Sequence, residues 1–236
     1  MTGPEQLTLA LAHRPAQGRD DFLVSTSNEA AFRAVAEGAL GPRLALSGPE
    51  GSGKTHLASI WGRETGAVSI SATELTEPRL ERLMTEAAVV VEDADRMANL
   101  PGPAQRQVEA LLFHLYNLGM AEGRGLLITG RKPPARWDVQ TPDLASRLAS
   151  MDHIAIEPPD DELLSAILRK LFKDRQLTVG VNVLEYLVRR MERTFAAAEQ
   201  VVEDLDRMAL AEKRAITRPL AARLFGTDMD ETGKED

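Results

Sequence analysis

The chain contains no cysteine among its 236 residues, which excludes disulfide bonds and thiolate metal sites. It also lacks an apolar run long enough to cross a bilayer, and its first residues lack the basic start and apolar core of a signal peptide. Its histidines are far apart in sequence, and none has the spacing of a metal-ligand motif. These absences predict a cytoplasmic protein that does not contact a membrane.

Positive charge is also limited in this sequence. The 28 lysines and arginines are outnumbered by 36 aspartates and glutamates, which gives a net charge of −8, and they form no long basic run. Since non-specific attraction to DNA depends on positive charge, this composition argues against a protein that grips the DNA backbone. The apolar fraction of 43% and the charged fraction of 27% are ordinary for a soluble globular protein.

The clearest feature that the sequence does contain is a phosphate-binding loop. Residues 48–55 read Gly-Pro-Glu-Gly-Ser-Gly-Lys-Thr and match the pattern G-x-x-x-x-G-K-T. An apolar run at residues 44–47 precedes the loop, and apolar residues at helical spacing follow it over residues 55–61. In such a strand–loop–helix unit, backbone N–H groups and the positive end of the helix dipole point at the phosphates. A glycine-rich surface turn is the alternative, which the flanking context disfavours.

The loop predicts that the chain binds ADP or ATP together with Mg²⁺. Lys54 would reach the β- and γ-phosphates, and the Thr55 hydroxyl would coordinate the metal ion. The predicted nucleotide contacts in and beside the loop are Gly48, Pro49, Glu50, Gly51, Ser52, Gly53, Lys54, Thr55 and His56.

A second predicted part of the site is an apolar, β-branched run that ends in acids, over residues 87–95. Such a run suits a central parallel strand, because helices cover both of its faces. Ligands bind at the carboxyl ends of these strands. The run resembles a Walker B element, which predicts that Glu92 joins the Mg²⁺ shell and that Asp93 positions the attacking water. A strand that simply ends in acids is the alternative.

The remaining pattern predicts an α/β fold. We expect a helix over residues 29–40, capped by Asn28 and ended by Gly41, and a long amphipathic helix over residues 105–121. Further strands are predicted at residues 67–71, 126–129 and 153–156. Strands that alternate with helices predict a parallel sheet between two helical layers. Beyond Asp160 only helical apolar stripes occur, which predicts a small helical bundle.

The N-terminal residues do not have the pattern of a core element. Leu7, Leu9 and Leu11 alternate with other residues, so an extended peptide would carry all three on one side. Either an edge strand of the main sheet or a short motif for an apolar groove on a partner fits this pattern. The predicted organisation is a terminal peptide at residues 1–15, a nucleotide-binding domain at 16–159, a helical lid at 160–225 and an acidic, disordered tail at 226–236.

Three segments together resemble the DnaA branch of the AAA+ ATPases and, within it, the Hda family of DnaA-related regulators. They are residues 53–57, residues 127–130 with Pro133-Pro134, and residues 142–148, which read Pro-Asp-Leu-Ala-Ser-Arg-Leu. The resemblance covers residues 5–225. It implies an AAA+ P-loop ATPase fold, with a parallel-sheet αβα core and a small C-terminal helical lid.

The resemblance also implies a partner for the N-terminal peptide. Gln6, Leu7, Leu9 and Leu11 are similar to the Hda motif that binds the sliding clamp, the β subunit of DNA polymerase III. This similarity favours the linear-motif interpretation over the edge strand.

Three arginines match functional positions of the family. Arg147 stands where the family has its arginine finger, which acts on the ATP site of a neighbouring subunit. Arg131 occupies the sensor 1 position, and Arg193 lies near the sensor 2 arginine of the lid, which touches nucleotide from its own subunit. A surface ion pair stays the alternative for Arg147 and for Arg193.

Two departures from the family pattern bear on hydrolysis by this chain. Glu92 stands where Asp is usual for binding the metal ion, and Arg131 stands where many relatives carry Asn or Asp. Since small misplacements of a catalytic group are costly, both changes predict at most a weak ATPase that still binds nucleotide. The sequence also ends without the helix-turn-helix domain of DnaA, which predicts no direct sequence-specific DNA binding.

The resemblance implies a negative regulator of chromosomal replication initiation. Tethered to the DNA-loaded clamp, the protein would present Arg147 to the ATP site of DnaA and stimulate hydrolysis there. Its partners would be the clamp, DnaA and further copies of itself, in a homodimer or higher oligomer. Two alternatives stay open: an autonomous AAA+ ATPase acting as a helicase loader or transposition helper, and a catalytically silent adaptor on the clamp.

Overall fold

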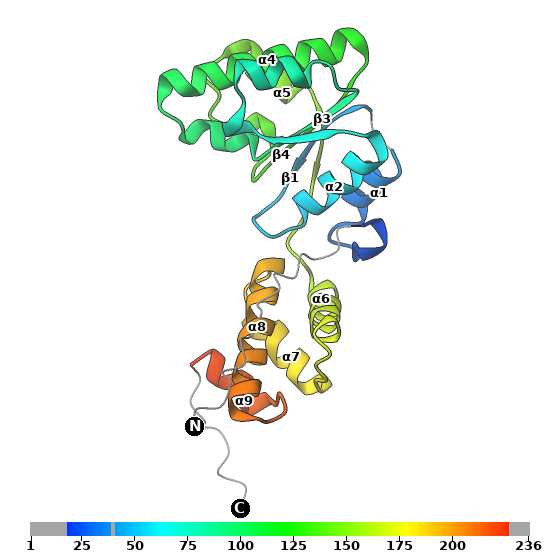
Figure 1. The fold of residues 1–236 in the computed structure, drawn as a ribbon, viewed down its shortest axis with the longest axis vertical. Coiled ribbons are helices and arrows are strands. Elements are labelled where there is room, and N and C mark those ends of the chain that lie inside the picture. Colours follow the sequence, from blue (N-terminus) through cyan, green and yellow to red (C-terminus); the bar gives the residue numbers. More distant parts are fainter. Residues whose placement is uncertain (1–17, 39–40, 227–236) are drawn as a thin grey trace, which may run out of the picture.

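The computed structural model of the chain describes residues 18–38 and 41–226. The residues of the clamp-binding prediction, Gln6, Leu7, Leu9 and Leu11, therefore lie outside the described residues. Residues 227–236 of the predicted tail also lie outside them. Figure 1 shows two bodies stacked along the longest axis, with a sheet and its helices at one end and a helical bundle at the other. Within the described residues, no helix has the length and apolar character that a bilayer crossing requires.

The sheet is parallel throughout, as the alternation of strands and helices predicts. Its strands run in the order β2-β3-β4-β1-β5, and each neighbouring pair is parallel. The strand bounds are Arg43–Ser47 for β1, Val68–Ser71 for β2, Ala88–Glu92 for β3, Gly125–Gly130 for β4 and Asp152–Ala155 for β5. The β-branched Val89, Val90 and Val91 of β3 are all buried, because helices cover both faces of the sheet.

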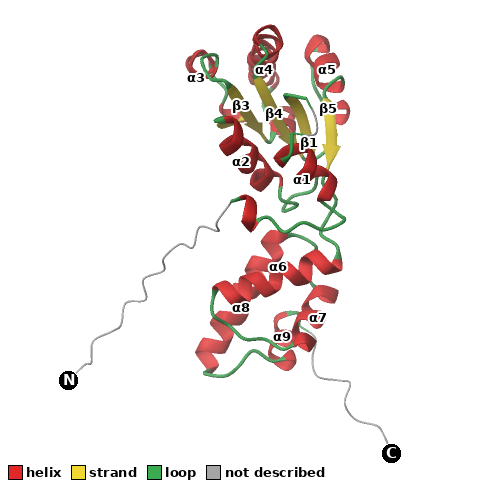
Figure 2. Cartoon of the chain, turned by 90° about the vertical axis from the view of Figure 1, so that its right-hand side faces the viewer, coloured by secondary structure: helices red, strands yellow, loops and turns green. Residues whose placement is uncertain are grey.

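Helices cover the two faces of the sheet in two separate groups (Figure 2). They are α1 (Glu29–Ala36), α2 (Lys54–Thr65), α3 (Glu77–Leu83), α4 (Gly102–Glu122) and α5 (Pro142–Ala149). Leu44 and Leu46 of β1 pack with α1 and α2, whereas Ala45 between them belongs to the cluster built with α3, α4 and α5. This alternation along one strand gives the three-layer αβα core that the sequence predicts.

The C-terminal helices form a hydrophobic core of their own. They are α6 (Asp161–Asp174), α7 (Val181–Arg190), α8 (Phe195–Glu212) and α9 (Arg218–Leu224). Leu168, Leu187, Val202 and Leu205 are fully buried in this cluster. The predicted apolar stripes therefore serve packing within a helical lid.

The first helix corrects two details of the sequence prediction. α1 ends at Ala36 rather than at residue 40, and Gly38 follows it with a positive φ of 64°. Asn28 precedes α1 but makes no capping bond with its side chain. Its Oδ1 instead accepts from the Ser25 amide, and its Nδ2 donates to the Leu23 carbonyl. The side-chain amide of Asn28 is thus bonded to the preceding loop rather than to the first turn of α1.

Three short helices have no counterpart among the individually predicted elements, namely α3, α5 and α9. Each follows a threonine (Thr76, Thr141 or Thr217) and carries proline in its first turn. This threonine–proline arrangement is a typical helix start, and it is the signal that could have located them.

Candidate nucleotide-binding site

The phosphate loop connects the end of β1 to the start of α2, and two of its glycines are required by crowding. A Cβ on Gly48 would lie 2.7 Å from the Ile156 carbonyl oxygen. Gly51 has a positive φ of 71°, and a Cβ there would lie 2.8 Å from Thr194 Cβ of the lid. The motif glycines therefore let the loop pass between the sheet and the lid.

Lys54 is nearly buried, and its side chain folds back over the loop. Its Nζ donates to the carbonyl oxygens of Gly48 and Pro49, each at 2.8 Å. Burial lowers the pKa of Lys54, and the carboxylates of Asp93 and Asp95 oppose that shift. A phosphate group held in this loop would meet the ammonium group together with the amides at the start of α2.

The loop also contains a buried polar atom that has no partner within the described residues. The Ser52 Oγ is inaccessible and makes no hydrogen bond there. Since buried hydroxyls are normally satisfied, this atom is consistent with a loop shaped for an oxygen-rich ligand. The loop residues therefore fit the phosphates of a nucleotide.

The two residues predicted to hold Mg²⁺, Thr55 and Glu92, lie in direct contact. The Thr55 hydroxyl donates to Glu92 Oε2 at 2.8 Å, and the Ser69 hydroxyl donates to Glu92 Oε1 at 2.7 Å. Sequence reasoning missed Ser69, because its contact depends on β2 pairing beside β3. Hydroxyl and carboxylate oxygens are ligands that Mg²⁺ accepts.

A protein-only metal cage is absent from the part of the chain that the structure describes. No group of three or more His, Asp or Glu side chains gathers there in a metal-binding arrangement. A magnesium ion at Thr55 and Glu92 would therefore take its other ligands from phosphates and water, which is its usual behaviour beside nucleotides.

Asp93 follows β3 in a left-handed conformation, with a φ of 53°. Its amide donates to the Thr129 hydroxyl at the end of β4, and its carboxylate pairs with Arg96 at 3.2 Å. Thr129 was part of a predicted strand, without a role in the site. The side chain predicted to position water is thus held by a neighbouring arginine in this structure.

Arg131 reaches from the end of β4 to the phosphate loop. Its guanidinium pairs with the Glu50 carboxylate at 2.8 Å, and its amide donates to Asp95 Oδ2 at 3.1 Å. The other oxygen of Asp95, Oδ1, is buried without a partner in the described ranges. The pairing of Arg131 with Glu50 was not predicted, because it links residues far apart in sequence.

The lid touches the phosphate loop through the start of α8. The Phe195 amide donates to the Gly51 carbonyl at 3.1 Å, and Thr194 caps α8 by accepting from the Ala197 amide. The neighbouring Arg193, predicted at the sensor 2 position, instead pairs with Asp161 at 2.5 Å. Its guanidinium is held at the start of α6.

His56, predicted beside the nucleotide, contacts the segment that precedes α1. Its Nε2 lies 3.0 Å from the Gly18 carbonyl, and its ring meets the edge of Phe22 at 5.1 Å between centroids. Burial lowers the pKa of His56, so the ring is neutral at physiological pH. Phe22 also stacks on Phe32, which places aromatic surface next to the phosphate loop.

Arg147 lies apart from these contacts, on α5. Its side chain is exposed, and no carboxylate pairs with it within residues 18–38 and 41–226. Leu144 and Leu148 of the same helix are fully buried against the sheet. Figure 1 shows α5 beside α4, at the end of the molecule away from the lid.

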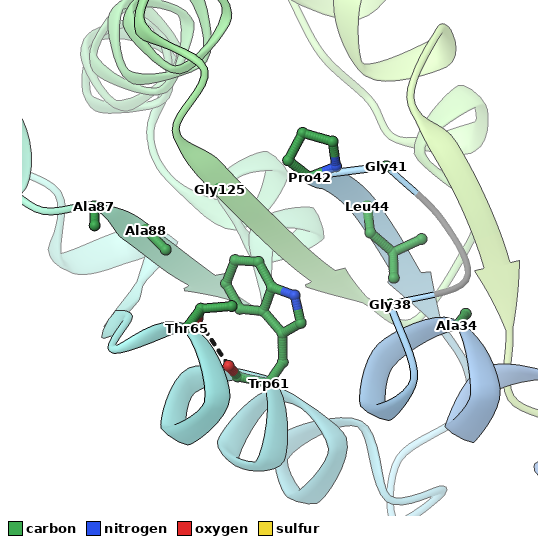
Figure 3. Close-up of a pocket in the computed structure, with 10 residues that line it drawn as sticks. All are labelled: Ala34, Gly38, Gly41, Pro42, Leu44, Trp61, Thr65, Ala87, Ala88 and Gly125. Atoms are coloured by element: carbon green, nitrogen blue, oxygen red, sulfur yellow. Dashed lines mark hydrogen bonds between the residues drawn. The ribbon is translucent and has the colours of Figure 1, made fainter.

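A cavity of about 420 Å³ opens elsewhere, at the amino-terminal ends of the strands. Figure 3 shows Trp61 projecting from α2 into this space, below β4. Its lining residues are Ala34, Gly38, Gly41, Pro42, Leu44, Trp61, Thr65, Ala87, Ala88 and Gly125. Because the lining carries no charge and ligands of parallel sheets bind at the opposite edge, this cavity is separate from the nucleotide site.

Comparison with known proteins agrees with this architecture. Residues 160–224 match the family described as "Hda, lid domain". Domain III of the replication initiation protein DnaA from Thermotoga maritima is 19% identical, with a TM-score of 0.77, covering 90% of this chain and 97% of that domain. AMPPCP-bound DnaA from Aquifex aeolicus is also 19% identical, with a TM-score of 0.69, covering 85% of this chain and 69% of that one.

A branch migration motor has the same fold. The RuvB Holliday junction motor of Thermotoga maritima is 18% identical, with a TM-score of 0.68, covering 89% of this chain and 71% of that one. At these identities the structural matches establish the AAA+ fold, while the lid match points to one branch of it.

Proposed function

We propose that this chain, which has the AAA+ fold of DnaA and matches the Hda lid family over residues 160–224, is a negative regulator of replication initiation. It binds the sliding clamp and stimulates hydrolysis of DnaA-bound ATP by inserting Arg147 in trans. The observation that carries this proposal is the contrast between its arginines. Arg131 and Arg193 pair with acids of their own chain, whereas Arg147 is exposed on a firmly packed helix and forms no ion pair with any described residue, Asp143 one turn earlier included.

The chain's own nucleotide, in this proposal, acts mainly on structure. ADP or ATP with Mg²⁺ would sit against Lys54, Thr55 and Glu92, beside the contact of Gly51 with Phe195 at the lid. A ligand in that position would stabilise one arrangement of the lid on the core. Turnover is not needed for this role, so ADP would suffice.

The clamp supplies the second part of the proposal. Gln6, Leu7, Leu9 and Leu11 would bind an apolar groove on the clamp as an extended peptide. Tethering raises the effective concentration of the regulator near DnaA without any new contact between the two proteins. Regulation would then be confined to DNA on which a clamp is loaded.

An arginine finger given in trans is worth about 10³–10⁵ in rate, or roughly 4–7 kcal/mol of activation barrier. The guanidinium suits this task because it is always charged and offers a planar pair of donors to phosphate oxygens. Loss of Arg147 should therefore abolish stimulation without unfolding the protein, since its side chain is exposed.

The proposal is tested by hydrolysis of DnaA-bound ATP in the presence of clamp-loaded DNA. We expect acceleration by the wild-type protein and loss of it in Arg147→Ala and in Leu9→Ala. Arg82→Ala is the matched control, because Arg82 is an exposed arginine on α3 without an ion pair to any described residue. A wild-type protein that hydrolyses ATP unaided but leaves DnaA-bound ATP intact would favour an autonomous ATPase instead.

A further inference from the structure

A fully buried carboxylate lies in the middle of α4, far from the phosphate loop in the sequence. Glu109 is 0% exposed, and no lysine or arginine pairs with it in the part of the chain that the structure describes. A buried charge without a counterion is costly unless hydrogen bonds satisfy it. The bonds made by Glu109 therefore indicate what this residue is for.

Four donors satisfy Glu109, and three of them belong to the turn that leads into α5. Its Oε1 accepts from Gln105 Nε2 and from the Gln140 amide, both at 2.9 Å. Its Oε2 accepts from the Thr141 amide at 2.8 Å and from the Thr141 hydroxyl at 2.7 Å. Charge-assisted bonds of this kind are about twice as strong as neutral ones.

Gln105, one turn earlier on α4, extends the same network. It is 3% exposed, its Nε2 also donates to the Asp138 carbonyl at 2.7 Å, and its Oε1 accepts from Gln140 Nε2 at 2.6 Å. Two buried polar side chains of α4 therefore fasten the backbone of residues 138–141.

That fastened turn is where the helix carrying Arg147 begins. Thr141 is the N-cap residue of α5, but its side chain makes no capping bond and donates to Glu109 instead. The carboxylate thus stands at the positive end of the α5 dipole, where negative charge is favourable. Leu144 and Leu148 fix the apolar face of α5, while Glu109 fixes its starting point.

We infer that Glu109 is a positioning residue, which sets the direction of α5 and thereby the position of Arg147 at the ATP of DnaA. This inference rests on the proposed function of Arg147 as a finger. A finger must be held closely, because a misplacement of about 1 Å can cost roughly 10²-fold in rate. Each oxygen of the Glu109 carboxylate accepts from two donors. A glutamine has one oxygen and one NH₂ group, so at this position its NH₂ group would face two donors and could not accept from them.

The test compares Glu109→Gln with Glu122→Gln, an exposed glutamate on the same helix. Stimulated hydrolysis of DnaA-bound ATP is measured at increasing amounts of regulator on clamp-loaded DNA. For Glu109→Gln we expect a maximal rate lower by about 10–100-fold at an unchanged half-saturating amount. The control should match wild type. A folded Glu109→Gln protein with the wild-type maximal rate would overturn the inference.

Amide hydrogen exchange of the full chain separates this inference from the proposed function. Faster exchange over residues 138–149 in Glu109→Gln supports the anchoring role even if Arg147→Ala still stimulates hydrolysis of DnaA-bound ATP at the wild-type rate. That second result would refute the finger alone. If Glu109→Gln does not fold, Thr141→Val removes one of the four donors and keeps the backbone amide. Unchanged exchange and an unchanged maximal rate in that variant would contradict the positioning role.

Discussion

The phosphate loop and α5 present arginines in opposite ways. Around the loop, Arg131 pairs with Glu50 and Arg193 pairs with Asp161, so both guanidinium groups are engaged within their own chain. On α5, Arg147 is exposed and forms no ion pair within the described residues. In the proposed function, the first region holds the chain's own nucleotide, while the second acts on the nucleotide of another protein.

The two regions also differ in how firmly their charged groups are held. Glu50 is 74% exposed in its side chain and Arg131 is 48% exposed, and surface pairs of this kind contribute only about 0.2–1 kcal/mol. They can rearrange when a phosphate enters the loop. Glu109, by contrast, is buried with four donors, so α5 is set before any partner arrives. Preset geometry is what an arginine finger needs.

The largest expected effect comes from Arg147→Lys, which keeps the charge but loses the planar pair of donors. We expect stimulated hydrolysis of DnaA-bound ATP to fall by about 10³-fold, the lower end of what a finger supplies. Phosphate release in a single turnover measures this loss, and thermal unfolding checks that the fold is intact. Retention of most of the wild-type rate would show that Arg147 contributes charge alone.

A smaller effect is expected at the chain's own site from Lys54→Gln. Removing the ammonium group should weaken ADP binding by about 10–100-fold, since a hydrogen bond to a charged group is worth roughly 1.5–3 kcal/mol. Titration with a fluorescent ADP analogue measures the change. Lys173→Gln serves as control, because Lys173 is exposed on the lid helix α6. Equal affinities of the two variants would remove Lys54 from the nucleotide site.

The contact of the loop with the lid can be isolated with two glycines. Gly51 and Gly66 have the same φ of 71°, but only a Cβ on Gly51 meets a neighbour, Thr194 Cβ at 2.8 Å. Alanine is disfavoured by the positive φ at both positions, so the difference between the variants mainly reports the crowding. We expect Gly51→Ala to lower the free energy of unfolding by about 1–3 kcal/mol more than Gly66→Ala, as measured by urea denaturation. Equal losses of unfolding free energy in the two variants would mean that the lid moves away from the added Cβ without cost, so that the contact is not crowded.

The smallest effect concerns pH. Burial lowers the pKa of His56 and of His153 from the ordinary value of 6.5. As the pH falls, the folded chain therefore binds these protons at a lower pH than the unfolded chain does. Their contribution to stability is therefore complete above pH 6.5 and is lost as the pH falls through and below that value. Urea denaturation at several pH values should show this decline, and His56→Gln should reduce it. An unchanged slope in His56→Gln would contradict the shift at this residue.

The sequence allowed the fold to be predicted because its signals are local. The β-branched run of β3 and the pattern Gly-Lys-Thr each identify an element from neighbouring residues alone. The contacts of Ser69 with Glu92 and of Arg131 with Glu50 could not be predicted in this way. They depend on the order of strands in the sheet and on which loops end at the same edge.

The burial of Glu109 could not be predicted from the helical pattern. In the amphipathic helix expected over residues 105–121, Val108, Leu111, Leu112 and Leu115 form the apolar face, and Glu109 lies at the border of that face. A carboxylate at such a border is usually exposed, so the pattern does not indicate a buried role. Its partners, Gln140 and Thr141, could not be identified, because they lie beyond the next strand in the sequence.

The most direct measurement of the central claim is single-turnover hydrolysis of ATP bound to DnaA, with two variants of this chain compared on clamp-loaded DNA. Asp93→Asn alters the residue proposed to position the attacking water in the chain's own site, and asparagine tolerates the left-handed backbone found there. We predict that Asp93→Asn retains stimulation and that Arg147→Ala loses it. If Asp93→Asn loses stimulation while Arg147→Ala retains it, the protein works through its own ATPase cycle, and the account given for α5 is wrong.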